Sequence, residues 1–171
     1  MASDKSCLVA NSNLIRRIAS KRDNFLTDVH IFMKEIIFLG LTALDVSRIS
    51  IWMIEDNKNG KCLKCVLNSD WYFSTIPTEF PILSQVNNPE YFSAIEIGNS
   101  IVVNNAEIDE RTKSFCDDYL KPQNIKSMLD TIIFKEGIPA GVVCCEQVGE
   151  PREWSVEEVH FTEVLADCCT Y

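Results

Sequence analysis

The chain has 171 residues, of which 46% are hydrophobic, and it carries a formal net charge of −9 with an isoelectric point of about 4.7. This length predicts one domain that buries a hydrophobic core without needing disulfide or metal staples. Because an acidic chain lacks a basic stripe, the composition argues against nucleic acid and anionic membrane surfaces as partners.

No secretory signal is visible at the start of the chain, because no apolar segment follows residues 1–5. The longest uncharged apolar run, residues 36–44, is too short to cross a bilayer. We therefore expect a cytoplasmic domain without direct membrane contact. The helical pattern at the other end reaches Tyr171 without a capping signal, which predicts that the helix continues into a further domain of a longer protein.

The eight cysteines are expected to be free thiols packed in the core, since a reducing compartment is predicted. Cys62 and Cys65 have the spacing of a zinc knuckle or a redox pair. In an extended strand, however, positions three apart point to opposite faces. The two thiolates converge only if Gly60 starts a knuckle-like turn, and a metal would still need a second pair such as Cys144 and Cys145. We therefore predict no metal and no cofactor.

A long helical pattern covers residues 12–44, and apolar side chains recur along it at spacings of three and four. The stripe consists of Phe25, Val29, Phe32, Ile36 and Leu39. It permits two interpretations. Either the helix packs only on the domain's own sheet, or it also pairs with a second copy. The second interpretation predicts a homodimer through Phe25, Val29, Phe32, Ile36 and the C-terminal helix.

The middle of the chain alternates between extended and turn-rich segments. The predicted elements are, in chain order, a strand over 48–55, a turn over 56–60, a strand over 62–68, an irregular stretch over 69–87, a helix over 90–97, a strand over 100–103 and a helix over 109–119. Gly98 is expected to end the first of these helices, and Pro122 to follow the second.

The last third of the chain predicts a hairpin and a capped helix. Two β-rich runs, 124–134 and 138–148, flank a short polar break that contains Gly137. Ser155, followed three residues later by Glu158, is a capping box that opens the final helix. One antiparallel sheet with helices on its faces is the simplest packing of this α+β order.

Several short sequences, in the correct order, resemble those of GAF domains, the ligand-binding and regulatory modules of bacterial signalling proteins. They are residues 44–52, Pro89–Ala94, Asp109–Thr112, Ser127–Asp130 and Pro151–Trp154. The sequence departs from the bacterial subgroup at Glu110, where Pro is usual, and at Gln147, where His is common. The resemblance covers about residues 26–171. It divides the chain into an extension with the start of the long helix, 1–23, and a GAF-like sensory domain, 24–171.

The resemblance implies a six-stranded antiparallel sheet with the terminal helices on one face. Short helices and loops, here about residues 70–122, would cover the other face and could enclose a ligand. It also implies an output module such as a histidine kinase or a diguanylate cyclase elsewhere in the protein.

A ligand site needs polar groups between apolar walls. The expected wall residues are Trp71, Phe92, Tyr119 and Met128, and the expected polar residues are Asp109, Arg111, Ser127 and Asp130. Arg111 near a helix start would suit an anionic group. Alternatively, Asp109 only caps a helix, Asp130 pairs with a lysine or with Arg111, and the domain's own side chains fill the pocket.

Catalysis is not predicted. Neither His30 nor His160 lies near a nucleophile motif, and no cysteine precedes a histidine as in bilin-binding relatives. The Asn-Lys-Phe-Asp-Glu pattern of cyclic-nucleotide-binding GAF domains is also missing. The enzyme alternative is a free methionine sulfoxide reductase with Cys116 as its thiol. We therefore expect a non-catalytic sensory domain that binds a small molecule or relays a signal by dimer rearrangement, with a ligand-free dimerisation module as a further alternative.

Overall fold

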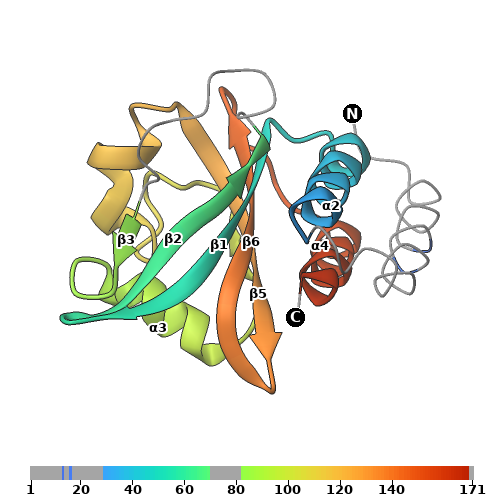
Figure 1. Cartoon of the computed structure of the whole chain (residues 1–171). Helices are drawn as coiled ribbons and strands as arrows, with labels where there is room; N and C mark the ends of the chain where they lie inside the picture. Colours follow the sequence, from blue (N-terminus) through green and yellow to red (C-terminus); the bar gives the residue numbers. More distant parts are fainter. Residues whose placement is uncertain (1–12, 14–15, 17–28, 70–81, 170–171) are drawn as a thin grey trace.

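Six strands form one antiparallel sheet in the order β3-β2-β1-β6-β5-β4 (Figure 1). The computed structural model describes residues 13, 16, 29–69 and 82–169, with only the backbone for Val29 and His30. Its elements are α2 (Val29–Leu44), β1 (Arg48–Asn57), β2 (Gly60–Asn68), β3 (Ile82–Ser84), α3 (Pro89–Ile97), β4 (Ile101–Val103), the short helices η3 (Lys113–Phe115) and η4 (Cys116–Leu120), β5 (Ile125–Lys135), β6 (Ile138–Val148) and α4 (Val156–Cys168). The predicted α+β class and six-stranded antiparallel sheet are confirmed.

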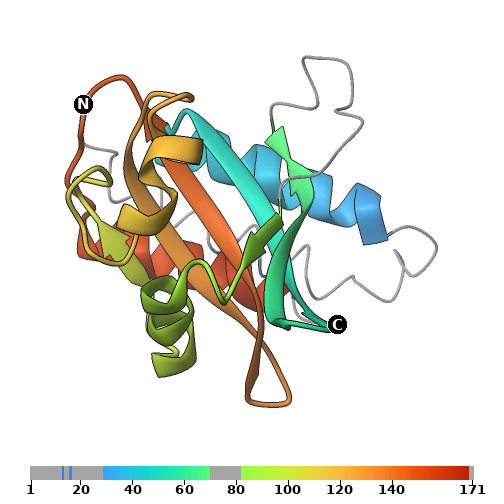
Figure 2. The ribbon, with the colours of Figure 1, turned by 90° about the vertical axis from the view of Figure 1, so that its left-hand side faces the viewer.

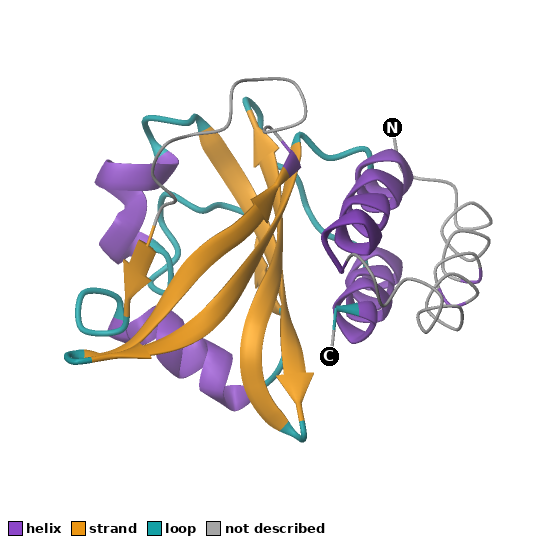
Figure 3. Ribbon diagram, viewed as in Figure 1, coloured by secondary structure: helices purple, strands orange, loops and turns teal. Residues whose placement is uncertain are grey.

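Helices cover both faces of the sheet. Helices α2 and α4 pack side by side on one face, while α3, the short helices and their loops lie over the other (Figures 2 and 3). Because both faces are covered, successive residues of a central strand enter different cores. On β6, Cys144 belongs to the cluster under α3 and the short helices, and Cys145 belongs to the cluster under α2 and α4.

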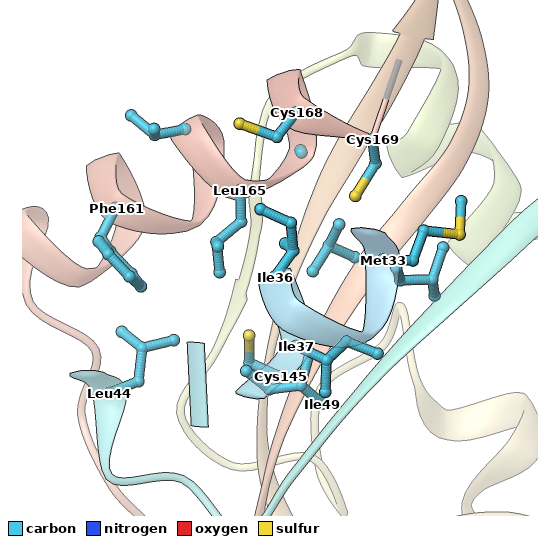
Figure 4. Close-up of a cluster of buried hydrophobic side chains, with 14 of the residues drawn as sticks. Met33, Ile36, Ile37, Leu44, Ile49, Cys145, Phe161, Leu165, Cys168 and Cys169 are labelled. Atoms are coloured by element: carbon cyan, nitrogen blue, oxygen red, sulfur yellow. The ribbon is translucent and has the colours of Figure 1, made fainter. Parts of the chain in front are cut away.

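The described apolar side chains on the inner side of α2 belong to the core between this helix, the sheet and α4; Figure 4 labels Met33, Ile36 and Ile37 among them. Phe32 and Ile36 are only 2% and 1% exposed, so they belong to the domain's own core. The prediction that these two side chains contact a second copy is therefore wrong, because they are already covered by β1 and α4. Phe25 lies outside the described residues, as do most residues of the predicted helix before position 29. Within the part of the chain that the structure describes, no helix is long and apolar enough to span a membrane.

The hairpin and the final helix form as the sequence predicts. Glu136 and Gly137 connect β5 to β6 with φ of 54° and 79°, the left-handed geometry of a two-residue hairpin turn. Ser155 Oγ accepts a hydrogen bond from the Glu158 backbone N–H at 3.2 Å, and Glu158 Oε2 accepts one from the Ser155 N–H at 2.8 Å. Gly98 ends α3 in the left-handed conformation, as expected.

Two predictions of local structure are wrong. Residues 82–84 were expected to be irregular but pair with β2 as β3. Three residues are too few for an alternating pattern to show in the sequence. Residues 109–119 form no α-helix, because Asp109 Oδ1 accepts the Arg111 N–H at 2.9 Å and starts a turn. That turn is followed by the 3₁₀ helix η3 and by η4, a π-helix that ends just before Pro122.

Gly141 allows the central strands to approach. A Cβ atom at this position would lie 2.3 Å from the Trp52 carbonyl oxygen, which is a backbone atom and cannot rotate away. We predict that Gly141→Ala lowers the free energy of unfolding by about 1–3 kcal/mol, as overpacking in a core does. Urea denaturation measures the difference. Ile138→Thr is the control on the same strand, because Ile138 is exposed, and it should change stability by less than about 0.5 kcal/mol. Equal stability of the two variants would contradict the close contact.

Candidate functional site

A pocket of about 330 Å³ lies on the face of the sheet opposite α2 and α4. Strands β1, β2, β5 and β6 supply its floor, and β3, α3, η3 and η4 supply its walls. Figure 2 shows how α3 and the short helices lie over this face of the sheet. The floor residues are Trp52, Leu63, Met128, Cys144 and Glu146. The wall residues are Ile82, Leu83, Ser84, Asn87, Asn88, Tyr91, Ser114, Phe115, Asp118 and Tyr119. This volume is suited to a small organic molecule.

Aromatic rings make up much of the lining. Tyr91 and Phe115 are 5.3 Å apart between ring centres, and Trp52 and Tyr119 are 6.2 Å apart, both in edge-to-face contact. Phe115 also contacts Tyr119 at 6.4 Å. These contacts join the β1 floor to α3, η3 and η4, and so fix the walls relative to the sheet.

A buried ion pair holds one end of the pocket. Arg48 and Glu146 face each other across β1 and β6, and Arg48 Nε donates to Glu146 Oε2. Tyr119 Oη donates to Glu146 Oε1 at 2.9 Å, and Arg48 also donates to Gln123 and to Tyr119. Glu146 is 0% exposed, so its carboxylate depends on these partners. Burial, followed by the Glu146 charge, raises the pKa of Tyr119 well above its usual value.

A second polar group lies behind the floor. Asp130 faces Cys144 across β5 and β6, and Tyr91 Oη donates to Asp130 Oδ2 at 2.5 Å. Burial raises the pKa of Asp130 to about 7, although the Cys144 thiol and the Tyr91 hydroxyl favour its charged form. Asp130 Oδ1 has no hydrogen bond of ordinary geometry within the described part of the chain. Burial and the neighbouring Asp130 also raise the pKa of Cys144 well above its usual value, so this thiol is protonated.

The family profile of the GAF domain matches residues 28–169, which include all of this sheet and pocket. The chain belongs to the GAF domain family. Such domains are generally sensory and non-catalytic. No curated protein matches the chain.

Solved GAF structures share the fold at low sequence identity. The GAF domain of a phosphoenolpyruvate-protein phosphotransferase from Coxiella burnetii is 16% identical, with a TM-score of 0.64, and the match covers 93% of this chain and 92% of that one. The blue-light-absorbing PixJ GAF domain of Thermosynechococcus elongatus is 17% identical, with a TM-score of 0.65 and coverage of 84% of both chains. A domain of a two-component sensor histidine kinase protein from Sinorhizobium meliloti, described as putative, is 15% identical, with a TM-score of 0.54 and coverage of 82% and 87%.

The predicted site residues of this GAF domain fall into four groups. Tyr119 and Met128 line the pocket. Phe92 and Asp130 are buried beside it without lining it, at 1% and 0% exposure. Trp71 lies outside the described residues. The remaining three, Asp109, Arg111 and Ser127, do not line the pocket either.

These last three residues are engaged in local structure. Arg111 Nη2 donates to Asp109 Oδ2 at 2.6 Å and to the Val102 carbonyl at 2.7 Å. The hydrogen bonds from Arg111 lower the pKa of Asp109. Ser127 Oγ donates to the Asn104 carbonyl at 2.7 Å and accepts the Arg152 N–H at 2.8 Å, so it ties the loop after β4 to the loop after β6.

The cysteines singled out in the sequence point to backbone carbonyls. Cys116 Sγ lies 3.8 Å from the Glu107 carbonyl oxygen, is buried, and does not line the pocket, so the geometry does not favour the reductase alternative. The Cys62 and Cys65 thiols donate to different carbonyls, those of Glu55 and Leu67. Among the residues that the structure describes, no group of three or more candidate ligands is placed to hold a metal ion.

The buried polar residues Arg48 and Glu146 are not among the site residues predicted from the sequence. A charged residue within an otherwise apolar strand is a signal for a paired or functional group. Arg48 stands at the start of a predicted strand, and Glu146 follows the apolar run of another. The pairing of β1 with β6, which brings them together, is a tertiary contact that neither local pattern specifies.

Asp130 makes the stability of the domain depend on pH. Its pKa is raised from 3.8 to about 7 in the folded state, so the folded protein binds more protons than the unfolded chain between these values. Its contribution is therefore most favourable below about pH 4 and is lost as the pH rises through 7. We predict that the stability of Asp130→Asn depends much less on pH than that of the wild type between pH 5 and pH 8.

Urea denaturation at pH 5 and pH 8 provides the test. Between pH 5 and pH 8, the free energy of unfolding should fall less in Asp130→Asn than in the wild type, by a difference of more than about 1 kcal/mol. Asp56→Asn, which changes an exposed carboxyl near the end of β1, is the control and should keep the wild-type dependence. If Asp130→Asn and the wild type lose the same stability, Asp130 does not titrate in this range.

Proposed function

We propose that this GAF domain senses a small molecule bound in the pocket between the sheet and the α3, η3 and η4 layer. The observation that carries the proposal is the pocket itself, whose apolar and aromatic walls enclose a few fixed polar groups. The edge-to-face ring contacts and the Arg48–Glu146 pair pre-form the site. The domain itself performs no bond-making step. Among the described residues, Cys144 is the only thiol that lines the pocket, and its pKa is raised well above the usual value, mainly by burial, which makes it a poor nucleophile.

The central strands connect the pocket to the helix layer. Met128 and Cys144 line the pocket, whereas the next residue on each strand, Leu129 and Cys145, packs under α2 and α4. A shift of β5 or β6 on ligand binding therefore changes the surface on which the terminal helices rest. Interiors are close-packed, so such shifts favour one of a few discrete arrangements. The output is an attached module such as a histidine kinase or a diguanylate cyclase.

Ligand binding can be tested by blocking the pocket. Ser114 lines it, and Ser93 lies on α3 outside it; both are exposed. Ser114→Trp should weaken binding of any compound found in a ligand-observed NMR screen by at least about tenfold, because a ring fills the pocket mouth. Ser93→Trp, the matched control, should bind as the wild type does. Both variants must keep the wild-type melting temperature.

Two results would count against a sensory pocket. The first is a broad screen in which no compound raises the melting temperature, since a ligand that binds only the folded state must stabilise it. The second is binding that is unaffected by Ser114→Trp.

A signal passed between two copies of the domain would use the outer face of α2. Phe32 and Ile36 are unavailable, but Ile31 and Phe38, seven residues apart on the helix, are 50% and 67% exposed. A spacing of seven places both side chains on one helix face. A second copy of the domain that covers this face would link the rearrangement of the sheet to a dimer of the attached output module.

Sedimentation velocity tests this contact. Phe38→Glu should shift the protein towards the monomer, with a dimer dissociation constant raised by at least about tenfold, because a charge would be buried without a partner. Ile138→Glu is the control, since Ile138 is also 67% exposed but lies at the start of β6, in the hairpin, away from α2. Dimers of equal strength in the two variants would exclude this face.

A further inference from the structure

The pocket is lined by aromatic rings and carboxylates. Trp52, Tyr91, Phe115 and Tyr119 contribute rings, and Asp118 and Glu146 contribute acidic groups. Among the described residues that line it, none is a lysine or an arginine. This composition favours a positively charged ligand, because aromatic faces and carboxylates both attract cations.

The two carboxylates have different roles. Glu146 is neutralised by Arg48, which lies behind the wall with its guanidinium carbon 5.8 Å from the centre of the Tyr119 ring. Asp118 is exposed at the pocket, and its carboxylate makes no hydrogen bond or ion pair within the described part of the chain. By contrast, its neighbour Asp117 pairs with Lys121 at 2.6 Å and lies outside the pocket. Among the described residues that line the pocket, Asp118 therefore supplies the uncompensated negative charge.

The described cationic side chains near the pocket are not placed to bind an anionic ligand. Arg48 already donates to Glu146, Gln123 and Tyr119. Arg111 is engaged by Asp109 and does not line the pocket. A carboxylate or a phosphate would lose its hydration and face carboxylates, which is costly.

We infer that the pocket binds a small organic cation, an amine or a quaternary ammonium compound with apolar substituents, held between the aromatic rings and beside Asp118. This inference rests on the proposed function, since it names the ligand class of the same pocket. The apolar substituents would contact Leu63, Leu83 and Met128, while the charge lies near the rings and the Asp118 carboxylate. A cation over ring faces gains most where water is excluded.

Three compounds of almost the same shape test the charge preference. Choline carries a trimethylammonium group, 3,3-dimethylbutan-1-ol is its neutral carbon isostere, and 3,3-dimethylbutanoate is an anion of similar size. Their dissociation constants would be measured by titration of ¹⁵N-labelled domain at low salt. We expect choline to bind about three- to thirtyfold more tightly than the neutral alcohol, the range that cation–π contacts give. The anion should bind most weakly.

Variants at neighbouring acidic residues separate the site charge from the overall negative charge. Asp118→Asn should weaken choline binding by about two- to fivefold and leave the alcohol unchanged, since the carboxylate is exposed and partly screened. Asp117→Asn removes the same charge one residue away and should leave both unchanged. Because both side chains are exposed, neither substitution is expected to affect folding.

The outcomes distinguish this inference from the proposed function. Equal binding of choline and the alcohol, or tighter binding of the anion, would overturn the cation preference while leaving a ligand pocket. Equal effects of Asp118→Asn and Asp117→Asn would show attraction by net charge alone and also overturn it. If none of the three compounds binds but Ser114→Trp blocks another compound, the ligand class is wrong and the sensory pocket stands.

Discussion

Helices pack on both faces of the sheet, and this constraint determines most of the structure. Every central strand must supply side chains to two cores, and each step of one residue changes the core that a side chain enters. On β5 and β6, neighbouring residues such as Met128 and Leu129 therefore belong to different halves of the molecule. A one-residue slip between strands would exchange the two sets, so the register is strongly specified.

The two cores differ in chemistry. The core under α2 and α4 is mainly apolar, and Figure 4 shows its leucine, isoleucine and cysteine side chains. Its buried polar groups include the hydroxyls of Thr131 and Thr162, which contact each other at 2.8 Å. The core under α3 and the short helices contains the pocket and the buried carboxyls of Asp130 and Glu146. Burying a charge is costly without a partner, and an apolar core would be the more stable arrangement. The buried carboxyls of Asp130 and Glu146 both lie in the half of the domain that contains the pocket.

Elements with strong local signals were predictable from the sequence. The Ser155–Glu158 capping box and the turn at Gly137 form as expected, since each depends on residues close together in the chain. The short strand β3 and the replacement of an α-helix by η3 and η4 were not foreseen. Three residues carry no readable period, and the Asp109 side chain competes locally with helix formation.

The candidate site was only partly predictable for a related reason. Tyr119 and Met128 were named from the sequence and line the pocket, but Arg48, Glu146 and Trp52 were not named. Arg48 and Glu146 are 98 residues apart in the chain and meet only because β1 pairs with β6. The prediction that Phe32 and Ile36 contact a second copy was wrong for a similar reason. The sequence shows that these residues share a helix face, but it does not show which surface covers that face.

The amino-acid sequence by itself determined the α+β class, the order of most elements and the family resemblance, because periodicity, turns and caps are local properties of the chain. The tertiary structure alone decided which residues share the pocket, that Asp109 and Arg111 bind each other, and that the site is lined by rings and carboxylates. Those facts depend on strand pairing and on the packing of distant segments. Both arise from the burial of surface over the whole chain, which no short stretch of sequence specifies.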